Sequence, residues 1–285
     1  MKSVGNLKKI TRALEVVSTV KLQKIKDKAD QQKEYILDLI NIVSTTWSIS
    51  DLFENDSIHP KYSDRALHIV VTSERWLCGW LNSKLLRKSY NDMNQNPADV
   101  FVVGKKWLEF YKRVDAEIVW SVHVPDSFDQ ESLLPLYTFF DQAIESKKYT
   151  SIYIYYNYFK NSIVQVPTAM QVYPFTSWSF TTLVSDLEIE TMTSIDAWEK
   201  DLLVEPSAQE FATEARRQLR NVVLSSTILQ NKAGEHASRM IAMKNAKDNA
   251  TTMWKKLKQT FNKARQWAIT QEISEIVSAK IAIWD

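Results

Sequence analysis

The chain contains little glycine and a single cysteine. Its 285 residues include 4 glycines, where ordinary usage of about 7% would give roughly 20. None of the patterns G-x-G-x-x-G, G-x-x-x-x-G-K-[ST] or G-x-S-x-G occurs, so the loops that usually hold phosphate or a serine nucleophile are not predicted. Cys78 has no partner for an internal disulfide, which favours a reducing compartment.

Long apolar runs and metal-binding spacings are also missing. No segment reaches the roughly 18 to 20 apolar residues of a membrane span, and the first 15 residues lack the apolar core of a signal peptide. The histidines are scattered, at positions 59, 68, 123 and 236. We therefore expect neither a metal nor a cofactor. The net charge of +2 gives no global field toward nucleic acid or membrane.

Proline is confined to the middle of the chain. All 7 prolines lie between residues 60 and 206, and each would cost about 3 kcal/mol inside a helix. This distribution predicts a helix over 1–58, an α/β domain over 62–204 and a second helix over 206–285, with Pro206 at the first helical position.

Both ends show helical periodicity. Apolar residues alternate in steps of three and four, a pattern that requires a partner helix. A helix from 207 to 282 would span more than about 110 Å, a length that only the N-terminal helix could cover. We therefore predict an antiparallel coiled coil that protrudes from the domain. The predicted seam contains Val4, Leu7, Ile10, Leu14, Val17, Val20, Ile25, Ala29, Ile36, Ile40 and Val43 in the first helix and Met240, Met243, Ala246, Ala250, Met253, Leu257, Phe261, Ala264 and Ala268 in the second.

The middle of the chain alternates between strand-like and helix-like segments. The β-branched and aromatic runs predict strands over 66–73, 99–106, 117–124 and 151–159, and helices over 79–94, 105–115 and 131–148 separate them. Residues 163–175 contain two prolines and therefore predict an edge strand. The order indicates a small Rossmann-like α/β domain with helices on both faces of the sheet.

The predicted helices are basic where they would lie side by side. Residues 1–33 contain nine basic and three acidic residues, and residues 207–285 contain thirteen and seven. A basic surface of this kind attracts acidic groups on a partner that surrounds it.

Three segments resemble a known family. "SVGNLKKITRALEVVSTVKLQKIK" (3–26) is similar to the N-terminal helix of the γ subunit of F-type ATP synthases, and "EHASRMIAMKNAKDNA" (235–250) and "FNKARQWAITQEISEIVSA" (261–279) are similar to its C-terminal helix. "TSERWLCGWLN" (72–82) resembles the family's strand-to-helix turn, commonly S-D-R-G-L-C-G-G-L-N. The resemblance runs from end to end and is weakest between 120 and 200.

The resemblance implies a rotor rather than an enzyme. In that family the terminal helices form a shaft inside a ring of α and β subunits, and the α/β domain sits near the ε subunit and the membrane ring of c subunits. Ion flow turns the c ring, and the shaft changes the catalytic sites in sequence. The implied location is peripheral, on the cytoplasmic face of the plasma membrane, with no nucleic acid as a partner.

The resemblance also assigns residues to partners. By their position in the family motifs, the residues implied to contact the catalytic ring are Leu14, Arg239, Arg265, Gln266, Thr270 and Glu272. Glu205 matches the family position at the foot of the shaft, near the c ring. The family's N-terminal helix usually begins about ten residues earlier, so we expect either an upstream start or a shorter shaft.

Tryptophan is the main departure from the family. Trp76, Trp80 and Trp107 stand where the family commonly has glycine, and Trp254 and Trp267 stand where small residues are usual. We hypothesise that the gene uses a code in which UGA means glycine and that UGA is written here as Trp. Replacing all 10 would give 14 glycines. A chain made with tryptophan should then pack badly at 76 and 80, since overpacking costs about 1–3 kcal/mol per site.

Two other interpretations remain open at this stage. An α/β enzyme with a coiled-coil arm would need a polar pocket at the carboxyl ends of its strands. A basic coiled coil could instead bind nucleic acid, with strong salt dependence.

Overall fold

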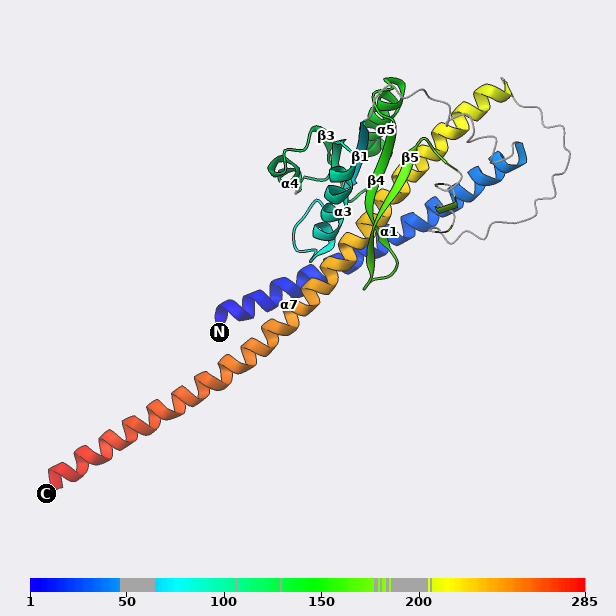
Figure 1. The fold of residues 1–285 in the computed structure, drawn as a ribbon. Helices are drawn as coiled ribbons and strands as arrows, with labels where there is room; N and C mark the ends of the chain where they lie inside the picture. Colours follow the sequence, from blue (N-terminus) through cyan, green and yellow to red (C-terminus); the bar gives the residue numbers. More distant parts are fainter. Residues whose placement is uncertain are drawn as a thin grey trace. The chain divides into compact units, whose positions relative to one another are not determined.

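The structure is a computed structural model that describes residues 1–46, 65–105, 107–128, 130–176, 179, 181–182, 185, 205 and 207–284 (Figure 1). It divides into two compact units. One contains residues 1–18 and 240–285, and the other contains residues 19–239. The predicted domain limits at 58, 62, 204 and 206, together with Pro206 and three of the tryptophans (47, 178 and 198), lie outside the described residues.

Two long helices contribute to both units. Helix α1 spans Lys2–Thr46 and α7 spans Ala208–Trp284. Ser207 caps α7, because its hydroxyl accepts from the Glu210 backbone N–H at 3.2 Å and donates to the Glu210 carboxylate at 3.2 Å. The two helices meet in antiparallel order, since Glu15 pairs with Lys247 and Gln32 donates to Ser225.

The larger unit contains a five-stranded sheet with the order β3-β2-β1-β4-β5. The first four strands in the chain are parallel: β1 (Ala66–Val71), β2 (Ala98–Val103), β3 (Ile118–Val122) and β4 (Ser151–Phe159). Strand β5 (Gln165–Tyr173) is the antiparallel edge strand, in agreement with the prediction for 163–175.

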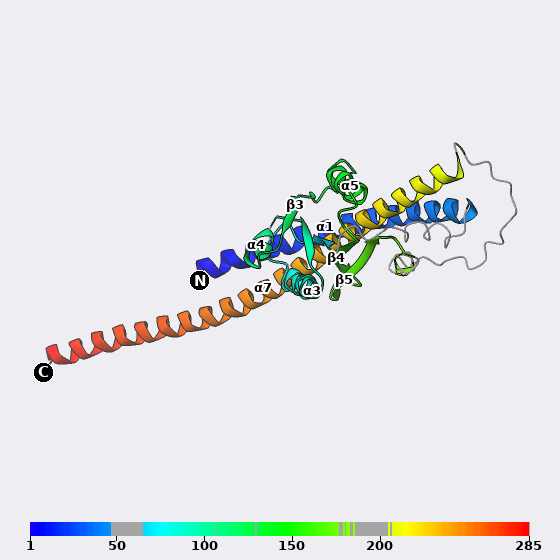
Figure 2. The same cartoon turned by 45° about the horizontal axis from the view of Figure 1, so that its top comes forward.

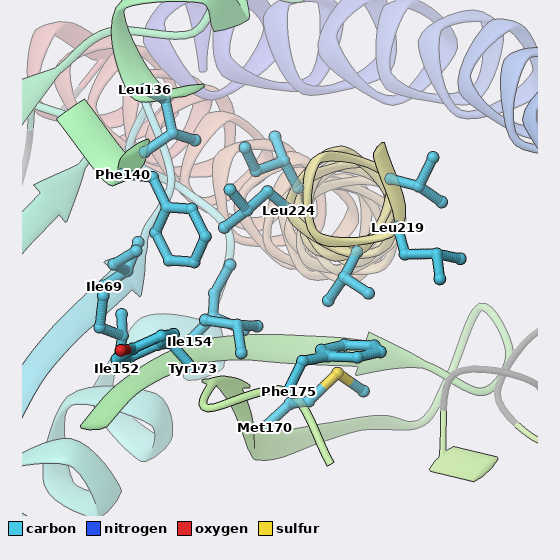
Figure 3. Close-up of a cluster of buried hydrophobic side chains, with 14 of the residues drawn as sticks. Ile69, Leu136, Phe140, Ile152, Ile154, Met170, Tyr173, Phe175, Leu219 and Leu224 are labelled. Carbon is cyan, nitrogen blue, oxygen red and sulfur yellow. The ribbon is translucent and has the colours of Figure 1, made fainter. Parts of the chain in front are cut away.

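Different helices cover the two faces of this sheet. Helix α5 (Gln130–Glu145), together with parts of α1 and α7, packs on the face that carries Leu67, Ile69 and Ile154 (Figure 3). Helices α3 (Leu81–Gln95) and α4 (Leu108–Arg113) pack on the face that carries Val70 and Val102. Figure 2 shows α3 and α5 on opposite sides of the strands. The predicted fold class, an antiparallel helix pair plus a small Rossmann-like α/β domain, is confirmed.

The predicted seam between the two helices is right in one part and wrong in another. Ile25, Ile36, Ile40 and Val43 are buried, as predicted. Near the N-terminus, however, Thr11 and Ser18 are the buried residues of α1, and their hydroxyls donate to the carbonyls one turn earlier. Leu7, Ile10, Val17 and Val20 from the predicted seam are exposed, and so are Met253, Leu257 and Phe261 of α7. The apolar stripe of these segments therefore includes a second face that the helix partner does not cover.

Candidate partner-binding surface

The last part of α7 has no cover from the rest of the described chain. We call residues 251–280 the distal segment. Every side chain from 263 to 280 is exposed, and Figure 1 shows this end of α7 continuing past the N-terminus of α1. The exposed large apolar side chains of the distal segment are Met253, Leu257, Phe261, Trp267, Ile269, Ile273, Ile276 and Val277. An exposed apolar surface of this extent on a helix is typical of a protein-binding site.

Helix α1 also exposes apolar side chains in the smaller unit. Leu7, Ile10, Val16 and Val17 are each about half exposed. Behind them the helices are joined by small buried side chains, Thr11 and Ser18 of α1 and Ala250 of α7. Small residues allow two helix backbones to approach closely, so the larger apolar side chains remain available to another molecule.

Four of the predicted ring contacts lie on the distal segment. Arg265 and Glu272 are seven residues apart and share one helix face, while Gln266 and Thr270 share the adjacent face. All four are exposed, and the Thr270 hydroxyl donates to the Gln266 carbonyl at 2.9 Å. This set offers a cation, an anion and an amide within about two turns of helix.

Leu14 lies on α1 in the smaller unit and is partly buried. Its carbonyl accepts from the Ser18 hydroxyl at 2.7 Å. The adjacent Glu15 pairs with Lys247 of α7, so Leu14 is on a stretch of α1 whose position against α7 is fixed.

Arg239 has a different environment from the other predicted ring contacts. It belongs to the larger unit and is 6% exposed. Its guanidinium contacts the buried carboxylate of Glu235 and donates at 3.3 Å to the carbonyls of Arg75 and Trp76. The side chain therefore connects α7 with the turn between β1 and α3, a role that the sequence analysis missed.

Glu205 is exposed but isolated among the described residues, because 186–204 and 206 lie outside them. Its predicted contact at the foot therefore stays a prediction.

The turn that carries Trp76 and Trp80 is not overpacked. Trp76 is 56% exposed and Trp80 78% exposed, and the Trp76 ring lies 5.7 Å from the Trp107 ring between centroids. The expected bad packing at these two positions was therefore wrong. In this turn the backbone adopts the left-handed conformation at Leu77 (φ 71°) and Gly79 (φ 59°), and not at the two tryptophans.

Cys78 is a free, buried cysteine. Burial is the main cause that raises the pKa of its thiol, and the Asn82 amide donates to its sulfur at 3.2 Å. Among the described residues, no group of three histidine, cysteine or acidic side chains is arranged to hold a metal. The described helices include none with the length and hydrophobicity to cross a bilayer.

The larger unit also contains a group of buried polar side chains that the sequence patterns did not predict. Lys232, Glu235 and His236 of α7 are each at least 96% buried. Lys232 and His236 contact the loop after β3, and Glu235 pairs with Arg239 of the same helix. The sequence did contain a signal of this burial. These charged residues lie in the helical stretch at positions where an apolar face would be expected.

Comparison with known proteins agrees with this architecture. A family model described as ATP synthase matches residues 1–283. The ATP synthase gamma chains of Xanthomonas axonopodis pv. citri (strain 306) and Xylella fastidiosa (strain 9a5c) are each 33% identical to this chain, over 99% of its length and 96% of theirs.

Solved structures share the fold at lower identity. A chain of the Euglena gracilis mitochondrial ATP synthase superposes with a TM-score of 0.62 at 18% identity, and the match covers 99% of this chain and 92% of that one. A chain from the central stalk and c ring of the Tetrahymena thermophila mitochondrial enzyme gives 0.57 at 19% identity, with 83% and 99% covered. The full-length match to the family model and to relatives at 33% identity shows that this chain belongs to the ATP synthase gamma chain family.

Proposed function

We propose that this chain is the central-stalk rotor subunit of the F1 sector of an ATP synthase. It couples ion-driven rotation of the membrane c ring to conformational change at the catalytic sites of the ring of α and β subunits. The chain itself is non-catalytic, because the reacting groups belong to the surrounding subunits. Family membership favours this function over the enzyme and nucleic-acid-binding alternatives.

The observation that carries this proposal is the uncovered distal segment. A helix that exposes Phe261, Trp267 and Ile276 to water leaves apolar area unburied, at a cost of roughly 25 cal/mol for each Å². A ring of subunits around the helix would cover this area on all sides. The helix contains no proline and a single glycine, Gly234, which suits a rod that must carry torque.

The contact residues are those implied by the family motifs, and the exposure of four of them supports the assignment. We assign Arg265, Gln266, Thr270 and Glu272 to the inner surface of the catalytic ring, together with Leu14 on α1. Charged groups on a rotating surface attract or repel fixed charges with a strength that depends on angle and distance. The basic character of residues 1–33 supports an acidic partner.

The remaining family assignments concern the rest of the complex. Glu205 is assigned to the foot, near the c ring, and the α/β domain is assigned to the ε subunit and the c ring. The chain is then a peripheral membrane protein at the cytoplasmic face of the plasma membrane. The resemblance also assigns Arg239 to the catalytic ring, and its guanidinium would have to leave Glu235 and two backbone carbonyls to make that contact.

Co-expression with the α and β subunits encoded by the same genome tests the function. We expect one complex that contains this chain and hydrolyses ATP. The double variant Gln266→Ala/Thr270→Ala should lower hydrolysis by the assembled complex. Glu109→Gln is the matched control, because Glu109 lies on α4, outside the distal segment, and pairs with the exposed Lys112. Failure to co-purify, or equal effects of the variant and its control, would contradict the proposal.

A further inference from the structure

Buried charges in the larger unit gather around one loop. We call residues 123–128, which follow β3 and precede α5, the bridging loop. Its contacts reach α1 at Lys21 and Lys28 and α7 at Lys232 and His236. The loop therefore touches both long helices, although it belongs to the α/β domain.

Backbone carbonyls form the first set of connections. Lys232 Nζ donates to the Val124 carbonyl at 2.7 Å, and Lys28 Nζ donates to the carbonyls of Ser127 and Phe128, the latter at 3.3 Å. A backbone acceptor cannot move away by changing its rotamer. The charged donors therefore hold the loop itself rather than a flexible side chain.

Asp126 forms the second set of connections and contacts both helices at once. Its carboxylate pairs with Lys21 of α1, and its Oδ1 lies 3.6 Å from His236 Nε2 and 3.7 Å from Lys232 Nζ of α7. The neighbouring His236 is the largest cause that holds the pKa of Asp126 far below its usual range. Lys21 and Lys232 act in the same direction, and burial opposes them.

A second acid fixes the bridging loop to the turn after β1. Glu74 Oε1 lies 2.7 Å from His123 Nδ1 and accepts from the Val124 backbone N–H at 3.2 Å. The same turn receives Arg239 through the carbonyls of Arg75 and Trp76. The Ser238 hydroxyl also donates to the Cys78 carbonyl at 2.6 Å. The contacts on α7 thus run from residue 232 to residue 239 along two turns of helix.

We propose that Asp126 is a torque-bearing positioning residue: its carboxylate locks the bridging loop to α1 and α7, so that the α/β domain cannot slip around the helix pair. This inference rests on the proposed rotor function. It concerns how force passes within this chain, not how the chain contacts its partners.

A charged lock is needed because apolar packing alone offers little resistance to sliding of the α/β domain against the helices. Contacts such as those of Leu224 with the sheet face (Figure 3) are non-directional, and neighbouring side chains can replace one another. The charge-assisted hydrogen bonds from Lys21 to Asp126 and from Lys232 to the Val124 carbonyl are directional, and breaking one leaves an unpaired charge in a poorly solvated place. A small rotation of α7 against the loop would break the hydrogen bond from Lys232 to the Val124 carbonyl. It would also weaken the electrostatic contacts of Asp126 with His236 and Lys232, which lie at 3.6 and 3.7 Å.

The variants Asp126→Asn and Asp126→Glu in the reconstituted synthase test this inference. Asp126→Asn keeps the shape and removes the charge, and Asp126→Glu keeps the charge. In inverted vesicles, Asp126→Asn should lower the ratio of ATP-driven ion pumping to ATP hydrolysis severalfold, while the amount of assembled complex is unchanged. Asp126→Glu should restore most of the ratio. Glu109→Gln is the matched control, because Glu109 is exposed on α4 and pairs with the exposed Lys112 of the same helix.

Hydrogen exchange of the assembled complex supplies an independent readout. Backbone amides of the bridging loop should exchange about tenfold faster in Asp126→Asn than in the parent, because local opening no longer breaks a charged contact. A pumping ratio equal to that of Glu109→Gln would overturn the inference and leave the rotor function intact. A parent chain that never joins the catalytic ring would overturn the rotor function instead, while the exchange difference could still be measured on the free chain.

Discussion

Lys247 Nζ on α7 lies 2.7 Å from Glu15 Oε2 on α1 and joins residues 232 positions apart in the chain. Both side chains are about three-quarters buried, so the pair is less screened by water than an ordinary surface ion pair. This charged contact connects the two helices of the smaller unit, beside a seam that includes the buried Thr11, Met243 and Ala250.

The Glu15–Lys247 pair should contribute modestly to stability. Glu15→Gln is expected to lower the free energy of unfolding by about 0.5–1 kcal/mol, near the upper end of the range for partly exposed pairs. Thermal unfolding of Glu15→Gln, Lys247→Met and the double variant forms a mutant cycle that isolates the pair. The exposed pair Lys112–Glu109 serves as the comparison, and Glu109→Gln should change little. A coupling energy of zero in the cycle would show that the pair does not stabilise the helices.

Gly104 and Gly5 should respond in opposite ways to alanine. At Gly104 the backbone has φ 107°, and an added Cβ would lie 2.7 Å from the Thr72 carbonyl oxygen. We expect Gly104→Ala to lower the free energy of unfolding by more than about 1 kcal/mol, since both the conformation and the space exclude a side chain. At Gly5, inside α1, an added Cβ meets nothing within 4 Å, and alanine should stabilise by up to about 0.5–1 kcal/mol. Denaturant unfolding of both variants measures the difference, and equal effects would contradict it.

Stability should fall as pH is lowered through the titration of His68. Burial lowers the pKa of His68 from 6.5 to about 4, and the attraction of Asp92 offsets only part of this shift. A base whose pKa is lower in the folded state stabilises the fold above pH 6.5. That contribution is lost between pH 6.5 and 4, because the unfolded chain takes up the proton first.

The matched measurement compares the parent with His68→Gln. Between pH 7 and pH 4 the parent should lose roughly 2–3 kcal/mol more unfolding free energy than the variant, at ~1.4 kcal/mol for each unit of pKa shift. The pH dependence is compared, not the absolute stability, because removing the 3.4 Å contact between His68 and Tyr155 has its own effect. Parallel pH profiles would contradict the prediction.

The glycine-code hypothesis predicts the identity of five residues. If UGA encodes glycine in the source organism, the native protein has glycine at positions 76, 80, 107, 254 and 267. Sequencing the gene and measuring peptide masses from the native source decide this, and UGG codons at these positions would contradict it. The structure adds a second expectation. Because Trp76, Trp80 and Trp267 are mostly exposed, a chain with glycine at all three should be more soluble than the chain with tryptophan.

The sequence predicted the architecture because each element has a strong local pattern. The proline-free ends indicated α1 and α7, and the β-branched runs indicated β1 to β4 within one or two residues at most ends. Pro167 indicated the edge position of β5, since an edge strand needs fewer backbone donors. The family resemblance then supplied the function, which periodicity alone left open.

The sequence could not separate the two apolar faces of the helices. Leu7 and Ile10 continue the same periodic pattern as Ile25 and Ile36, yet only the second pair is buried. Periodicity records that an apolar face exists but not which molecule covers it. The burial of Arg239 was missed for a similar reason, because its acceptors at Arg75 and Trp76 lie 164 and 163 residues away in the chain.

The placement of α7 in the core of the α/β domain also affects biosynthesis. Residues Ala212, Leu219 and Leu224 complete the hydrophobic cluster on one sheet face, although the ribosome makes them after every strand. Until about residue 230 has left the exit tunnel, the nascent sheet must keep an apolar surface open to the cytosol. Chains stalled or truncated before α7 should therefore aggregate or engage chaperones, and the smaller unit can assemble only after the residues that follow 239 have left the tunnel.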